Sequence, residues 1–280
     1  MTMPDWAVDL TDLHAHAAPS LLPRHGDDRA TVAAEQAVGF TTVVLKAHEG
    51  STVERAAAAG GAAAGVYGGV VLNSPVGGAN PDAVEVAARL GGRVVWMPTV
   101  SARTHKAGAA SPELSVHRGF ELAPVDVLRD DGALLPQWHD VLDVVSAHDL
   151  LLASGHLSAD ETVVLFRAAR AHGVQRLMVN HPKMAFLHWN DEAAEALQHL
   201  DAQLELGILP DLLSDAEHAS LSLTRGYPAS LLVFGGDLGH ADHAPPAVAV
   251  APWLTDLEKH VGTDTAVAIM TTQSRSLLLP

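Results

Sequence analysis

Eight short runs of apolar, largely β-branched residues recur along the 280-residue chain, and an Ala-rich segment with helical periodicity follows most of them. The runs are nearly continuously apolar rather than alternating, which is typical of strands buried on both faces in a parallel sheet. This repetition constrains the fold more than any other feature. The predicted strands cover residues 7–13, 41–46, 65–72, 93–99, 150–155, 175–180, 203–209 and 231–237.

The segments between the strands predict helices. Asn80 followed by Pro81, and Ser158 followed three residues later by Glu161, are helix-start signals. Strand–helix alternation without a break in composition predicts an α/β fold, a single (β/α)8 TIM barrel over residues 1–280. The predicted helices cover 28–38, 51–64, 81–91, 136–148, 158–172, 190–201, 214–226 and 245–261, with a closing helix at 264–279 against the outside or bottom of the barrel.

One connection is too long to be a simple loop. Residues 100–135 separate the fourth strand from its helix, and the piece "VDVLRDDGALL" predicts a hairpin that turns at Asp-Asp-Gly. An insertion at this place would lie over the mouth of the barrel. We expect a lid or hairpin there, and an excursion without a functional role is an equally weighted alternative.

Composition excludes several classes of protein. No window approaches 18 uninterrupted apolar residues, the start "MTMPDW" lacks the features of a secretion signal, and there is no cysteine for disulfide or thiolate chemistry. The net charge of −16 and the lack of a basic cluster argue against nucleic-acid binding. We expect a cytoplasmic enzyme that acts on a small molecule, away from membranes, and that forms a homo-oligomer, as large acidic barrels often do.

Histidines stand out among the polar residues, and the chain has 17 of them. His14 and His16 follow the first strand two residues apart, so an extended backbone points both to one face. Barrel enzymes carry their chemistry at the carboxyl ends of the strands. Further polar residues at or near strand ends are Lys46, His48, Asn73, Thr99, Ser101, His105, His156, His181, Glu205, Asp211, Asp237 and His240.

A single histidine at a strand end is more often structural than functional. Here five of the eight predicted strands end in His or Asp, and packing alone does not easily explain this pattern. If these groups converged without a cation, buried polar atoms would be left unpaired. Several His with one carboxylate form a common ligand set for Zn²⁺ or another divalent transition metal. The pattern predicts a metal centre, most simply with one or two zinc ions, that includes His14 and His16.

With these residues the chain resembles the amidohydrolase superfamily of metal-dependent (β/α)8 hydrolases. The family pattern is His-x-His after strand one, His after strands five and six, and Asp after strand eight. The resemblance extends from residue 8 to about residue 240. The sequence pattern "DLHAHAAPS…VVLKAHEGS…GHLS…NHPKM" also resembles an uncharacterised, amidohydrolase-like branch of that superfamily. The resemblance implies the metal ligands His14, His16, His156, His181 and Asp237.

The chain departs from that pattern after strand four, where the family commonly has Lys or Glu. The nearest candidate there is His105, whereas Lys46 stands after strand two. A second resemblance concerns "GFTTVVLKAHEGS", which is similar to the second motif of the polymerase-and-histidinol-phosphatase phosphoesterases. It implies that His48 is also a ligand, although "DLGH" has one residue more than the terminal Asp-x-His of that group.

These observations predict a metal-dependent hydrolase that uses an activated water on a C–N (amide or cyclic amide) or ester/lactone bond. The resemblance makes Asp237 a ligand and the general base. Lys46 either neutralises a substrate oxyanion or pairs with Asp237 or Glu49. Metal-dependent phosphoesterases and decarboxylases, and a binding protein with a degenerate site, are the alternatives.

Four residues are candidates for binding the substrate. Arg24, the cation in the first loop, either clamps a substrate carboxylate or forms a surface pair with Asp27 or Asp28. The other three candidates follow strands three, four and eight, and they are Asn73, His105 and His240.

Overall fold

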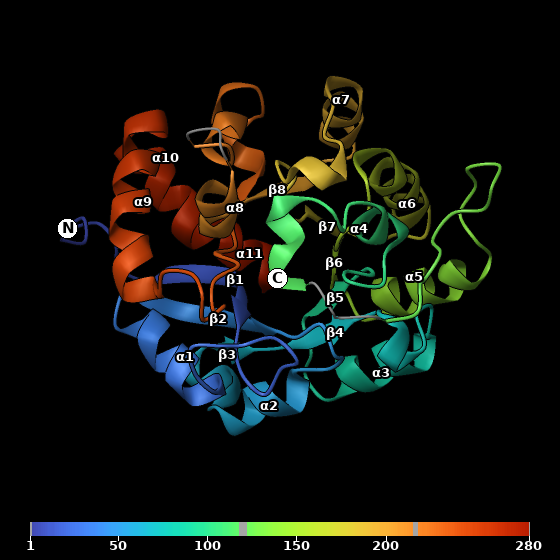
Figure 1. Ribbon diagram of the computed structural model, residues 1–280, viewed down its shortest axis with the longest axis horizontal. Coiled ribbons are helices and arrows are strands. Elements are labelled where there is room, and N and C mark those ends of the chain that lie inside the picture. Colours follow the sequence, from blue (N-terminus) through green and yellow to red (C-terminus); the bar gives the residue numbers. More distant parts are fainter. Residues whose placement is uncertain (1, 118–121, 215–217, 280) are drawn as a thin grey trace.

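A computed structural model describes residues 2–117, 122–214 and 218–279, in which strands and helices alternate as an α/β fold (Figure 1). Its strands form two sheets in which all pairings are parallel. The first sheet has the order β1 (Leu10–His16), β2 (Phe40–Lys46), β3 (Val66–Tyr67). The second has the order β4 (Gly69–Val71), β5 (Val94–Trp96), β6 (Leu151–Ala153), β7 (Arg176–Val179), β8 (Gln203–Leu206), β9 (Leu232–Phe234).

The larger helices surround the strands in chain order (Figure 1). Two predicted helix starts are confirmed: Asn80 accepts a hydrogen bond from the backbone N–H of Ala83, and Ser158 and Glu161 form a reciprocal capping box. The helices are α1 (Asp28–Gln36), α2 (Val53–Ala58), α3 (Pro81–Arg89), α4 (Arg103–Ala107), α5 (Gln137–Ala147), α6 (Ala159–Ala171), α7 (Asp191–His199), α8 (Ile208–Leu213), α9 (Pro246–Val261), α10 (Thr263–Ala268) and α11 (Ser274–Leu278).

The predicted third strand, 65–72, is divided into β3 and β4 at Gly68. The segment before α2 causes the division, because Thr52 exchanges hydrogen bonds with Gly69 and takes the place of a neighbouring strand. A Cβ at Gly68 would lie only 2.6 Å from the carbonyl oxygen of Thr52, so this close approach needs glycine. The two sheets are therefore consecutive parts of one series of strands.

The first and last strands of the series also meet. Beyond the end of β9, the backbone N–H of Asp237 donates to the carbonyl of His14, and the N–H of His16 donates to the carbonyl of Leu238. A parallel bridge joins Ala15 with Leu238. These bonds bring the carboxyl ends of β1 and β9 side by side.

Two predictions for the segment after residue 203 are wrong. The strand expected at 203–209 ends at Leu206, and Ile208 and Leu209 begin helix α8. The apolar run continues across Gly207, and a short apolar run alone does not distinguish a strand from a buried helix. The helix expected at 214–226 is a 3₁₀ turn at Leu221–Arg225 in its described part, and residues 215–217 lie outside the described residues.

Two other predicted helices are less regular than expected. The helix expected at 51–64 is α2 followed by a 3₁₀ turn at Gly61–Ala64, with glycines at positions 60 and 61 between the two. The closing helix expected at 264–279 consists of α10, a π-helical stretch at Ile269–Gln273 and α11.

Apolar side chains fill both faces of the strands, as the continuous apolar runs predict. Val43, Val95 and Leu177 belong to the cluster between strands and helices. The opposite faces form an inner cluster that includes Val44 and Trp96, and Leu277 and Leu278 of α11 join it. Arg176, at the start of β7, donates to the carbonyls of both these leucines, which places α11 at the amino ends of the strands.

The long connection after β5 has local structure of its own. It contains α4, a 3₁₀ segment at Pro112–His117, and an antiparallel bridge between Leu128 and Leu134 on either side of the Asp-Asp-Gly turn. Residues 118–121 of this connection lie outside the described residues. None of the helices in the described part of the chain is long and apolar enough to cross a membrane.

Candidate metal centre

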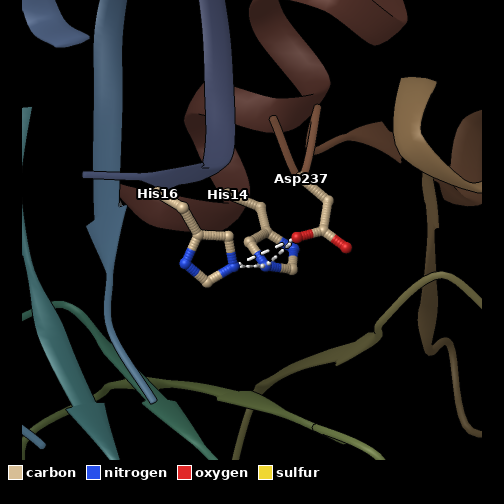
Figure 2. Close-up of side chains that lie close together, drawn as sticks. All are labelled: His14, His16 and Asp237. Carbon is tan, nitrogen blue, oxygen red and sulfur yellow. Dashed lines mark hydrogen bonds and ion pairs between the residues drawn. The ribbon is translucent and has the colours of Figure 1, made fainter. Parts of the chain in front are cut away.

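Three side chains meet at the carboxyl ends of β1 and β9 (Figure 2). Nε2 of His14 lies 3.2 Å from Nε2 of His16, and Oδ1 of Asp237 lies 3.0 and 3.1 Å from these two nitrogens. Atoms bound to one ion at about 2.0–2.1 Å are spaced by similar distances. Within the described residues, this is the group of His and carboxylate side chains whose atoms are placed to share an ion.

The backbone around the cluster is held by a fourth side chain. Oδ1 of Asp12 accepts hydrogen bonds from the backbone N–H of His14 and of Gly236, and so joins β1 to the segment after β9. Asp237 adopts a positive φ of 53°, a conformation that Asp tolerates better than most residues. The local path of the chain, not only the residue types, aims the carboxylate at the histidine pair.

The other ring nitrogens show which atoms are free to bind an ion. Nδ1 of His14 lies 3.0 Å from Oε1 of Glu205, and Nδ1 of His16 lies 3.1 Å from the carbonyl oxygen of Lys46. With a proton on each Nδ1, both Nε2 atoms present lone pairs to each other and to an anionic oxygen. Three acceptors that face one another in a buried site need positive charge. The ammonium of Lys46 supplies it at Nε2 of His14, and a divalent metal would satisfy all three atoms, so the donor set fits such an ion.

The pKa values of the cluster without a metal also indicate a site that attracts positive charge. Burial alone would lower the pKa of His14, but the carboxylates of Asp237 and Glu205 outweigh burial and raise it to about 9. Burial would raise the pKa of Asp237, but the charge of His14 and hydrogen bonds from both histidines hold it well below its usual range. The site therefore attracts positive charge strongly.

Lys46, predicted to be catalytic, lies at this cluster. Its Nζ is 2.9 Å from Nε2 of His14, its side chain is fully buried, and burial lowers its pKa to about 8. The predicted pairing with Glu49 is not formed, because Glu49 accepts hydrogen bonds from Ser20 and Leu21 instead. Lys46 is therefore placed beside the metal-facing nitrogen of His14.

The remaining predicted ligands form a row of imidazoles next to the cluster. The ring of His48 lies 5.0 Å from that of His16, and the ring of His156 lies 6.0 Å from His48 and 5.1 Å from His181. Nε2 of His181 is 4.0 Å from Oδ2 of Asp237. These three histidines border the site but do not belong to the group of side chains whose atoms are placed to share one ion.

His105, a predicted substrate-binding residue, is buried behind His156. The two rings stack at 4.8 Å, and their Nδ1 atoms are 2.7 Å apart. Asn73 is also buried, and its amide bonds the carbonyl of His48 and the backbone N–H groups of Thr99 and Ser101. Asn73 thus fixes the loops after three strands and is not among the residues that line the pocket.

A pocket of about 490 Å³, counted out to its open mouth, lies over the cluster. Its floor includes His16, His181 and Asp237, and the predicted substrate-binding residues Arg24 and His240 line its side. Arg24 does not pair with Asp27 or Asp28 at the surface, since Nη2 lies 3.3 Å from Nδ1 of His16. The lining combines apolar side chains with a few polar ones, as is common in small-molecule sites.

Several residues of the site were given no role by sequence reasoning. Glu205 lies within the apolar strand β8, and besides its contact with His14 it accepts hydrogen bonds from Asn180 and from the backbone N–H of His181. A charged residue inside a buried strand is the signal that could have identified it. Asp12, a buried acidic residue inside β1, carries the same signal. Glu113 and His243 lie outside the strands and carry no comparable signal.

Solved structures with a similar fold include several enzymes. A probable 2-pyrone-4,6-dicarboxylic acid hydrolase from Acinetobacter baumannii has a TM-score of 0.64 at 12% identity, covering 97% of this chain and 99% of that one. A TatD homologue from Escherichia coli K12 has a TM-score of 0.60 at 14% identity, covering 98% and 100%. A 2,6-dihydroxybenzoate decarboxylase from Rhizobium has a TM-score of 0.53 at 13% identity, covering 97% and 98%.

At these identities the likeness concerns the fold. A search of curated proteins found no match to the sequence. One family model matches residues 9–205, which include the histidine pair and Glu205 and make up more than half of the chain. The chain therefore belongs to the family of unknown function DUF6282.

Proposed function

We propose that the protein is a metal-dependent hydrolase of the amidohydrolase type, which acts on a C–N or ester/lactone bond of a small molecule. The observation that carries this proposal is the convergence of His14, His16 and Asp237, of which His16 and Asp237 line the floor of a pocket. The order of the strands and the contact between β1 and the end of β9 support a closed (β/α)8 barrel around this site.

We infer that His14, His16 and Asp237 would hold one divalent ion. Zinc is the simplest candidate for two imidazoles and a carboxylate. Such an ion supplies a Lewis acid for the scissile carbonyl and a water that ionises near neutral pH. His48, His156 and His181 border the same space and could take part in a second ion site.

The protein side chains have separate tasks in this proposal. Asp237 presents Oδ1 to the histidine pair, and its Oδ2, on the side of His181, is available to take a proton from water and pass it to the leaving group. Nδ1 of His181 is buried without a hydrogen-bond partner in the described part of the chain, so this ring can contact a substrate oxygen. Lys46 adds positive charge beside His14 and so contributes to stabilising negative charge at the site.

Two alternatives remain to be separated by experiment. A decarboxylase is compatible with the same cluster, and the fold likeness to a 2,6-dihydroxybenzoate decarboxylase favours keeping it as the second candidate. A phosphoesterase is less well supported. Of the described cationic side chains, Arg24 lines the pocket, whereas Arg103 is exposed and paired with Asp126.

The test is metal analysis of the purified protein, followed by assays with amides, lactones, phosphoesters and aromatic carboxylic acids. We expect a bound transition metal and hydrolysis of amides or lactones. Asp237→Asn should remove the activity, whereas His199→Asn, at an exposed position on α7, should not change it. Release of CO2 without hydrolysis would favour the decarboxylase, and turnover of phosphoesters alone would contradict the proposal.

A further inference from the structure

We propose that the substrate carries a carboxylate group that Arg24 and His240 bind beside the metal centre, while its apolar body packs against the apolar side chains of the same pocket. This inference rests on the proposed function in one respect, namely that the pocket over the cluster holds the substrate. It adds the chemical class of that substrate.

Arg24 is a partly buried cation on which the carboxylates of Asp237 and Glu49 act from a distance. An antiparallel bridge joins Arg24 to His240. Nη2 of Arg24 lies 3.3 Å from Nδ1 of His16, the ring whose Nε2 belongs to the candidate metal centre. Nε of Arg24 is buried with no hydrogen-bond partner, and in the described part of the chain no carboxylate lies within ion-pair distance. A guanidinium with unused donors at the edge of a pocket is suited to a carboxylate.

His240 supplies a second donor that is directed by its neighbours. Its Nδ1 accepts a hydrogen bond from the backbone N–H of Asp242, so the proton of the neutral ring is on Nε2. That Nε2 is buried and has no hydrogen-bond partner among the described residues, and the side chain, which is 5% exposed, lines the pocket. A buried donor without a partner is costly, so its position points to a ligand atom that accepts the bond.

His243 extends the same side of the pocket. Its ring lies 5.4 Å from that of His240, and its Nε2 is also buried without a partner among the described residues. Arg24, His240 and His243 come from the loops after β1 and β9, which lie side by side. Together they form a side of the pocket that is rich in donors; we call it the donor side.

Another part of the pocket lining is apolar. It is formed by Leu114, Met184, Phe186, Leu209 and Leu213, which belong to one cluster from the loops after β5, β7 and β8. Glu113 lies in this part, where both carboxylate oxygens face the backbone N–H of Ala185. The pocket is thus divided into an apolar part and a donor side, which suits a small apolar body with an anionic group at one end.

The charged side chains that line the pocket favour a carboxylate over a phosphate. Arg24 is the one guanidinium or ammonium group that lines the pocket among the described residues, and Asp237 and Glu113 add negative charge nearby. A phosphate dianion usually needs several cations, whereas a carboxylate can be satisfied by one guanidinium and a neutral N–H.

The experiment compares the binding of benzoate, benzamide and inorganic phosphate by calorimetry, with metal-loaded and with chelator-treated protein. We expect benzoate to bind about tenfold more tightly than benzamide in both forms, as a charge-assisted contact outside the metal centre requires. Arg24→Gln should abolish this preference and leave benzamide binding unchanged. Arg24→Lys should retain part of it, and Arg103→Gln, on the exposed side of α4, should have no effect.

Three results would overturn the inference. These are equal binding of benzoate and benzamide, benzoate binding that needs metal but not Arg24, and phosphate that displaces benzoate with higher affinity. Melting temperature and metal content of each variant show whether a loss comes from misfolding. If the protein binds no metal and hydrolyses nothing, yet shows benzoate binding that depends on Arg24, the proposed function fails and the carboxylate site stands.

Discussion

Oε1 of Glu205 on β8 lies 3.0 Å from Nδ1 of His14 on β1, and both side chains are fully buried. The contact joins strands that are far apart in the sequence and holds the imidazole so that its Nε2 faces His16 and Asp237. The charge of His14 outweighs burial and lowers the pKa of Glu205, so the carboxylate stays ionised. Glu205 is therefore the partner that orients His14 toward the other two side chains of the candidate metal centre.

We expect Glu205→Gln to weaken divalent-metal binding by about 10- to 100-fold, the usual effect of losing a carboxylate behind a ligand histidine. A glutamine has one acceptor oxygen for the three groups that Glu205 bonds, which are His14, Asn180 and the N–H of His181. Competition with a chromophoric chelator measures the affinity. Glu195→Gln, an exposed change on α7, is the control, and an unchanged affinity in Glu205→Gln would argue against this role.

Metal binding should stabilise the folded protein. A ligand present at 100 times its dissociation constant adds about 2.7 kcal/mol to the free energy of unfolding. We therefore expect zinc to raise the melting temperature of chelator-treated protein in scanning calorimetry. His14→Asn should remove this increase, and His199→Asn should preserve it. A shift of equal size in both variants would mean that zinc binds somewhere else.

Asn73 holds the loops around the site together, and we expect its loss to destabilise the fold. Asn73→Ala leaves the buried N–H groups of Thr99 and Ser101 and the carbonyl of His48 without their partner. At about 1–3 kcal/mol for each unsatisfied group, we expect a loss of roughly 3 kcal/mol or more in the free energy of unfolding. Urea denaturation measures it. Asn190→Ala, which removes an N-cap, should cost only about 1 kcal/mol, and equal losses would contradict the assignment.

The ion pair between Asp9 and Arg275 should contribute stability that depends on pH. Hydrogen bonds from Arg275 and Thr41 lower the pKa of Asp9 to about 2. A carboxylate with a depressed pKa stabilises the fold above its unfolded pKa near 3.9, and this contribution is lost as the pH falls toward 2.

Because the Asp9 side chain is 58% exposed, solvent screening reduces the expected effect of Asp9→Asn at pH 7 to less than about 1 kcal/mol. The difference from the wild type should shrink to nothing near pH 2 in denaturation curves. Asp130→Asn, at an exposed turn, should show no such trend. A destabilisation that stays constant down to pH 2 would show that the charge of Asp9 is not the cause.

Local sequence signals identified much of the site. The spacing of His14 and His16 at the end of an apolar strand predicted a shared face, and their Nε2 atoms do lie 3.2 Å apart. The capping signals at Asn80 and Ser158 were equally local and equally reliable. These predictions succeeded because they depend on the geometry of a few consecutive residues.

Other features could not be read from the chain. Periodicity did not separate the end of β8 from the start of α8, because apolar residues continue through Ile208 and Leu209. His105 was expected to face the substrate, but it stacks on the far side of His156. Whether a side chain at a strand end points into the pocket depends on the path of the following loop, which distant segments determine.

The amino-acid sequence predicts a repeated strand–helix architecture with imidazoles and carboxylates at the strand ends, because burial pattern and side-chain alternation are local properties. The folded structure is needed to show that Asp237 completes the histidine pair, that Glu205 orients His14, and that Arg24 and His240 both line the pocket. Each of these depends on backbone segments brought together from distant parts of the chain, such as the bonds that Asp12 makes to both sides of the site.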